Sequence, residues 1–146
     1  LLLGQIYLPL VLAAVTAWLL LERGAGHLAG ILIGLVAAMK PNFLVWPVLL
    51  FLAGHGRPAL TAAVTFGVVS ALPAFVLGPD VYRQWFDVLA GDADRARFPT
   101  NASLLGIASR GGLPGAGMVL SVALLLGAAA WALLRRPGTA RVSAFA

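Results

Sequence analysis

The stretch that decides the fold is residues 28–53, LAGILIGLVAAMKPNFLVWPVLLFLA, in which two apolar runs flank Lys40-Pro41-Asn42. A lysine within so apolar a sequence is costly in a membrane and therefore indicates a functional position. The proline removes a backbone hydrogen-bond donor and disfavours helical dihedral angles at the residue before it. The sequence therefore predicts one helix that ends near Lys40 and a second that begins at Pro41.

Two arrangements of this stretch are compatible with a bilayer. As one straight helix, its 26 residues would be about 39 Å long, whereas the hydrocarbon core is about 30 Å thick. One tilted helix would hold Lys40 near its midpoint. Two half-length helices over 28–39 and 42–53 would instead form a re-entrant hairpin with Lys40 at its tip, which requires protein or a wet cavity around the tip. We favour the hairpin and keep the single helix as the alternative.

The composition places the whole chain in a membrane. Of its 146 residues, 61% are hydrophobic and 10% are charged, whereas soluble domains carry roughly 25% charged residues. The chain has no cysteine, two histidines and five carboxylates, so we expect no metal and no cofactor. The net charge of +5 comes mainly from arginines at the ends of apolar runs. This placement indicates membrane topology and no binding to nucleic acid.

Three further apolar runs are long enough to cross a bilayer, which takes about 20 residues. They cover residues 1–21, 59–77 and 113–134. Within the polar loop over 78–112, residues 80–90 place aromatic and aliphatic side chains on one face of a 3.6-residue period, which is typical of an amphipathic helix in the membrane interface. We therefore predict an all-α, polytopic transmembrane protein with about five membrane helices, including the short re-entrant pair.

Glycines recur every four residues along the first half of the hairpin, at Gly26, Gly30 and Gly34. Small residues on one stripe let another helix approach closely, so we interpret this row as a packing face. The chain begins inside an apolar run and without methionine. We therefore expect it to be part of a single integral membrane domain whose N-terminal part is missing here.

The hairpin also determines which turns share a side of the membrane. It places the turns at 22–27, 54–58 and 135–141 together, where five arginines accompany one acid. Counted over lysine and arginine alone, the two sides carry five each, so the positive-inside rule does not decide the orientation. The Arg135-Arg136 pair beside the end of a span favours these turns as the inner side. The hairpin tip and the interfacial helix then face outward.

The hairpin tip is the first candidate site. Lys40, with the free amides of residues 42–44 at the start of the second helix, would bind an anion such as a lipid phosphate. The alternative is a lysine that only reaches from a helix end to the head groups. Gln5 and Tyr7, at the entrance of the first span, are candidates for hydrogen bonds to sugar hydroxyls. Ordinary anchoring in the interface explains these two equally well.

The outer loop supplies further candidates. Arg95, Arg97 and Arg110 would bind a phosphate or an anionic head group, although a solvated loop accounts for the same residues. Asn101 is expected to cap a short helix that ends near Arg110. The two histidines of the chain lie in turns, and we interpret both as structural.

The order of these features along the chain resembles that of a known family. The features are Gly4-Gln5, Leu28-Ala29-Gly30 to Gly34-Leu35, Ala37-Ala38-Met39-Lys40-Pro41, Gly78-Pro79 and Asn101-Ala102-Ser103-Leu104-Leu105-Gly106. Their succession resembles glycosyltransferase family 87, the polyprenol-phosphate-mannose-dependent mannosyltransferases of the GT-C superfamily. The resemblance covers roughly residues 4–134.

The resemblance implies an inverting transfer of mannose from a polyprenyl-phosphate donor to a glycolipid or glycan acceptor, on the outer face of a bacterial inner membrane. It implies that Lys40 binds the donor phosphate and stabilises the leaving group. The other cavity-lining residues that it implies are Gln5, Asn42, Asn101 and Ser103. The general base of such enzymes is an aspartate in the first outer loop, expected upstream of Leu1, so the segment alone is expected to be inactive. From the residues themselves, a secondary transporter with a broken helix and a membrane assembly subunit remain open.

Overall fold

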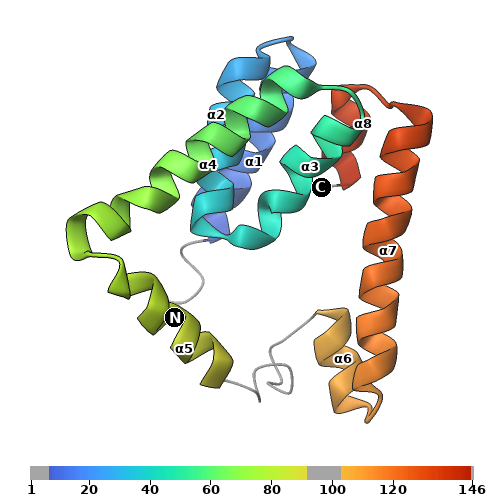
Figure 1. Cartoon of the computed structure of the whole chain (residues 1–146). Coiled ribbons are helices and arrows are strands. Elements are labelled where there is room, and N and C mark those ends of the chain that lie inside the picture. Colours follow the sequence, from blue (N-terminus) through green and yellow to red (C-terminus); the bar gives the residue numbers. More distant parts are fainter. Residues whose placement is uncertain (1–6, 92–102, 146) are drawn as a thin grey trace. The chain divides into compact units, whose positions relative to one another are not determined.

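The computed structural model describes residues 7–91 and 103–145, and nearly all of them are helical (Figure 1). This part of the chain forms eight α-helices and one 3-10 turn, and no strand. In order, they are α1 (Tyr7–Glu22), α2 (Gly26–Met39), η2 (Pro41–Leu44), α3 (Val45–Leu52), α4 (Gly56–Leu77), α5 (Asp80–Gly91), α6 (Leu104–Arg110), α7 (Pro114–Arg135) and α8 (Thr139–Phe145). The prediction of an all-α protein is confirmed.

The helices belong to two compact units. Unit 1 comprises residues 1–72 and 129–146, and unit 2 comprises residues 73–128. The helices α4 and α7 each contribute to both units. The largest fully buried side chains all belong to unit 1 and are Ile33, Leu49, Leu50, Val36 and Val142. The core that holds the hairpin in place therefore lies in unit 1.

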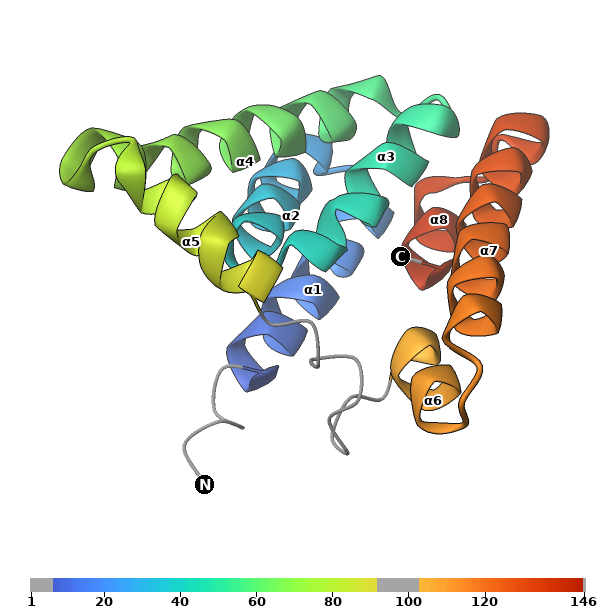
Figure 2. The same cartoon turned by 60° about the horizontal axis from the view of Figure 1, so that its bottom comes forward.

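The predicted break at Lys40 is present. Helix α2 ends at Met39, and Lys40 itself is extended, with φ −142° and ψ 97°. The second half differs from the prediction, because residues 41–44 form a 3-10 turn and the α-helix begins only at Val45. Figures 1 and 2 both show α2 and α3 running in opposite directions from this point, and the two helices contact each other.

The turns at the two ends of this hairpin lie together. Gly24 of the α1–α2 turn, residues 54–58 of the α3–α4 turn and Thr139 at the start of α8 line one cavity. A single straight helix over 28–53 would separate the first two turns by about 39 Å, so the chain reverses direction at Lys40. Because α2 has 14 residues, the tip lies about 21 Å along the helix axis from this shared end.

The predicted glycine row is a packing face, and its partner is α4. A Cβ atom at Gly30 would lie 2.7 Å from the carbonyl oxygen of Pro58, and one at Gly34 would lie 2.6 Å from that of Ala62. At Gly26, the first member of the row, a Cβ would meet Pro58 at 3.7 Å, an ordinary contact. The backbones of α2 and α4 thus approach too closely for any residue but glycine at the two inner positions.

Helix α8 was not predicted from the sequence, and it packs against α1 and α3. Its Val142 is fully buried. The indole Nε1 of Trp46 donates a hydrogen bond to the hydroxyl of Ser143 at 3.1 Å. The ring Nε2 of His55 donates to the carbonyl of Pro137 at 2.8 Å, since a carbonyl can only accept. These bonds fasten the C-terminal segment to α3 and to the turn after it.

Two described helices are long and apolar enough to cross a membrane, namely α4 and α7 with 22 residues each. They correspond to the spans predicted over 59–77 and 113–134. For the span predicted over 1–21, the described part of the chain contains α1, whose 16 residues measure about 24 Å. Whether α1, α2 and α3 enter the bilayer as predicted stays a prediction.

Unit 2 contains the predicted amphipathic helix as α5. Asp80 lies in its first turn, and Trp85 and Phe86 are 48% and 61% exposed, with their rings edge to face at 5.0 Å. An exposed aromatic face is what an interfacial helix needs. The predicted position of α5 within the membrane interface stays a prediction.

In unit 2, α6 and the first part of α7 form a short helical hairpin. Its first helix is capped by Ser103, whose hydroxyl accepts the N–H of Gly106 at 3.0 Å. The predicted cap was Asn101, which lies outside the described residues. A Cβ at Gly117 would lie 2.6 Å from that of Ala108, so this glycine lets α7 approach α6.

Candidate functional site

Lys40 lies at the tip of the α2–α3 hairpin because Pro41 follows it. The proline disfavours helical dihedral angles at Lys40 and so ends α2 there. The N–H of Lys40 still donates to the carbonyl of Val36 at 2.9 Å, and its own carbonyl accepts the N–H of Phe43 at 3.0 Å. The backbone is therefore hydrogen-bonded on both sides of the break, which holds the Cα of Lys40 at the tip.

These bonds correct one part of the predicted anion site. The amides of residues 42–44 were expected to be free, but the N–H of Phe43 is used by Lys40, and α3 begins only at Val45. The effect of a helix dipole falls off within the first turn, so the N-terminus of α3 adds little at Lys40. The positive charge at the tip is then that of the lysine ammonium.

The surface of the tip is both polar and apolar. Lys40 is half-buried, and Asn42 beside it is exposed. Met39, directly before the lysine, exposes 64% of its surface. A cation and an amide next to uncovered hydrocarbon suit an amphiphile whose charged head adjoins an apolar chain.

The sequence model of glycosyltransferase family 87 matches residues 1–146, the whole chain. The chain belongs to glycosyltransferase family 87. No curated protein and no solved structure matches it. The family assignment places the chain in a membrane glycosyltransferase, whose partners are a sugar donor, an acceptor and membrane lipid. It decides against the transporter and the assembly subunit that the residues alone had left open.

The remaining predicted site residues of this glycosyltransferase lie in both units or outside the described part. Asn42 is two residues from Lys40 at the hairpin tip. Tyr7 is the first residue of α1, and the hydroxyl of Ser103 in unit 2 accepts the N–H of Gly106. The predicted residues outside the described part are Gln5, Arg95, Arg97 and Asn101. Among the described candidates, Lys40 and Asn42 therefore share the hairpin tip.

A second polar site, which was not predicted from the sequence, lies at the opposite end of the hairpin. A cavity of about 450 Å³ there is lined by His27, His55, Arg57 and Thr139, among others. Its residues come from three turns that are far apart in the sequence, so no motif of fixed spacing predicts this cavity. The available signal was the excess of arginines in these same turns. In the described part of the chain, no three His, Asp or Glu side chains gather as metal ligands would.

Proposed function

We propose that this glycosyltransferase transfers mannose from a polyprenyl-phosphate donor to a glycolipid or glycan acceptor on the outer face of the membrane. In this proposal Lys40 binds the phosphate of the donor, and Asn42 lies beside it as a secondary polar contact. The observation that carries the proposal is the hydrogen-bonded break that holds a lysine at the tip of an apolar hairpin. An intramembrane charge of this kind indicates a site for a charged substrate group.

The chemistry needs such a charge. In an inverting transfer, the acceptor oxygen attacks the anomeric carbon of the sugar while the bond from that carbon to the phosphate oxygen breaks. The hydroxyl proton passes to a carboxylate elsewhere in the enzyme, and the bonding electron pair leaves with the polyprenyl phosphate. Negative charge therefore grows on the phosphate in the transition state. An ammonium that is already in place at the phosphate stabilises this state more than the ground state.

The hairpin geometry supports an outward-facing site. The three turns rich in arginine come together at the end of unit 1 opposite the tip. If that end faces the cytoplasm, as basic turns generally do, the tip points away from it. The tip lies about 21 Å along α2, less than the roughly 30 Å of the hydrocarbon core. It would therefore end within the outer half of the hydrocarbon core, on the outer side of the bilayer.

The test is Lys40→Ala in the full-length protein. Membranes containing the variant are assayed for transfer of labelled mannose from polyprenol-phosphate-mannose to a glycolipid acceptor. Loss of one group that stabilises the developing charge lowers kcat by about 10²–10³-fold in other enzymes, and we expect a fall of that size. Lys40→Arg keeps the charge and is expected to retain part of the activity.

The matched control is Arg23→Ala, which removes one positive charge from an exposed position in the α1–α2 turn. It should leave transfer near the wild-type rate, because it lies at the opposite end of the hairpin. Equal amounts of each variant in the membrane exclude a folding defect. Wild-type activity of Lys40→Ala would refute the role of the lysine. Activity with a nucleotide-linked donor instead of the lipid-linked one would refute the donor class.

A further inference from the structure

Two cavities of unit 1 meet at the start of α4. The first is the polar pocket at the shared end of the hairpin, with a volume of about 450 Å³. The second is an apolar groove of about 740 Å³ along α3 and α4. Gly56 and Arg57 line both of them. Each volume lies within the range of roughly 300–1,000 Å³ that ligand sites occupy.

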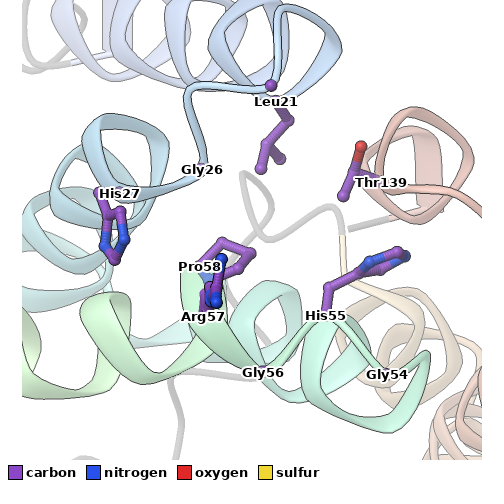
Figure 3. Close-up of a pocket in the computed structure, with 10 residues that line it drawn as sticks. Leu21, Gly26, His27, Gly54, His55, Gly56, Arg57, Pro58 and Thr139 are labelled. Atoms are coloured by element: carbon purple, nitrogen blue, oxygen red, sulfur yellow. The ribbon is translucent and has the colours of Figure 1, made fainter.

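The polar pocket is built from side chains fixed by hydrogen bonds. Figure 3 shows His27 and His55 on either side of Arg57 and Pro58. The hydroxyl of Thr61 donates to the carbonyl of Arg57 at 3.0 Å, so its oxygen accepts from Nδ1 of His27 at 3.2 Å. The Nε2 of His55 is bonded to a carbonyl of the segment before α8. Both ring N–H groups are thus already used within the protein, so the Arg57 guanidinium supplies the hydrogen-bond donors and the charge that this pocket offers to an anion.

The apolar groove is lined by hydrocarbon along most of its length. Val48 and Phe51 of α3 expose 53% and 67% of their surfaces, and Leu60 of α4 exposes 67%. Ala63 and Phe66 continue the α4 side of the groove. Its one charged lining residue among the described ones is Arg57, at the end where it meets the polar pocket.

We propose that the polar pocket and the apolar groove together bind one anionic phospholipid of the bilayer. Its phosphate lies beside Arg57 in the polar pocket, and one acyl chain follows the groove between α3 and α4. The charges are complementary, because the three turns at this end carry five arginines and one acid. Basic pockets between membrane helices are known to take anionic head groups.

This lipid site is separate from the proposed donor site. Arg57 belongs to the shared end of the hairpin, whereas Lys40 lies about 21 Å away along the axis of α2. Moving an acyl chain from the bilayer interior into an equally apolar groove lowers its free energy very little. Selectivity must then come from the head group, and so from Arg57.

The experiment measures lipid retention by the full-length protein in detergent, using native mass spectrometry. The protein is titrated with phosphatidylglycerol and with phosphatidylcholine of the same acyl chains. We expect the wild type to prefer phosphatidylglycerol, and Arg57→Gln to weaken that binding about fivefold, the effect of one basic residue near an anionic surface. Binding of phosphatidylcholine should not change. Arg57→Lys keeps the charge and should retain the preference.

Two further variants make the result specific. Arg23→Gln removes a charge at the same end from a residue outside both cavities, and it should bind like the wild type. Ala63→Phe fills the groove at an exposed position and should weaken binding of both lipids. Equal losses in Arg23→Gln and Arg57→Gln would overturn the proposal in favour of a general basic surface. Displacement of the lipid by glycerol phosphate alone would overturn the role of the groove, and wild-type binding by Arg57→Gln would overturn the role of the pocket.

Discussion

The two halves of the hairpin meet α4 in opposite ways. On the α2 side, Gly30 and Gly34 bring the two backbones so close that a Cβ atom at either glycine would lie within 2.7 Å of an α4 carbonyl oxygen. On the α3 side, a groove of about 740 Å³ remains between the helices. Neighbouring residues of α4 mark the contrast, since Ala62 is fully buried and Ala63 is exposed.

The difference shows how a membrane protein separates packing from binding. Lipid chains are as apolar as leucine side chains, so helices associate in a bilayer through close packing and not through the hydrophobic effect. The contact of Gly30 and Gly34 with α4, which we call the glycine seam, supplies such packing. On the α3 side, Pro47, Val48 and Phe51 line a groove whose surface is almost wholly apolar. One flank of α4 therefore holds the hairpin, and the other is available to a ligand.

The largest effect is expected from Gly34→Val in the glycine seam. The new side chain would clash with the backbone oxygen of Ala62, which cannot move without shifting α4. Overpacking of this kind costs about 3 kcal/mol at the upper end of its usual range. The measurement is the thermal unfolding midpoint of the full-length protein in detergent, which should fall. The matched control is Gly67→Val on α4, where a Cβ meets nothing within 4 Å and the change should stay below about 1 kcal/mol. An equal fall in both variants would mean that the seam is not tight.

A smaller effect is expected from Ser143→Ala, because α3 lacks a glycine seam and relies on α8. The substitution removes the acceptor of the Trp46 indole N–H, and that side chain is only 3% exposed. An unsatisfied buried donor costs about 1–3 kcal/mol, and we expect a loss of stability in that range. The control is Ser121→Ala on α7, whose hydroxyl donates to Gly117 of its own helix. If Ser143→Ala unfolds at the same temperature as the control, α8 does not support α3.

The local features of this fold could be predicted from the sequence. Pro41 ends a helix by its own geometry, so the break at Lys40 follows from two adjacent residues. The glycine row predicted a close helix contact because its four-residue spacing puts Gly30 and Gly34 on one face of α2. The choice of Lys40 as a site candidate followed from the cost of a charge in apolar sequence, and its role stays a prediction. Each inference needed only neighbours along the chain.

The features that depend on distant segments could not be predicted. The glycine row did not say which helix it meets, and α4 became its partner only through the tertiary fold. Helix α8 has seven residues, too few for a period to stand out, and its stability comes from burying Val142 and from the bond to Trp46. The prediction of free amides at the tip was wrong for a similar reason, because the N–H of Phe43 donates a 3-10 hydrogen bond to the carbonyl of Lys40. The cavity at Arg57 forms only where three turns that are far apart in the sequence come together.

The smallest effect is expected from Ala63→Leu on the groove side of α4, and its value lies in the comparison with Ala62→Leu. Ala63 is exposed, so a larger side chain there projects into the groove and should change stability by no more than about 0.5 kcal/mol. At Ala62, fully buried beside Gly30 and Gly34, the same substitution overpacks the glycine seam and should cost about 1–3 kcal/mol. Both variants carry the same added volume at adjacent positions of one helix, so helix propensity and total hydrophobicity cancel. Thermal unfolding in detergent should therefore separate them clearly. Similar midpoints for the two would show that the flanks of α4 do not differ in tightness, and the division between a packing side and a ligand side would then be wrong.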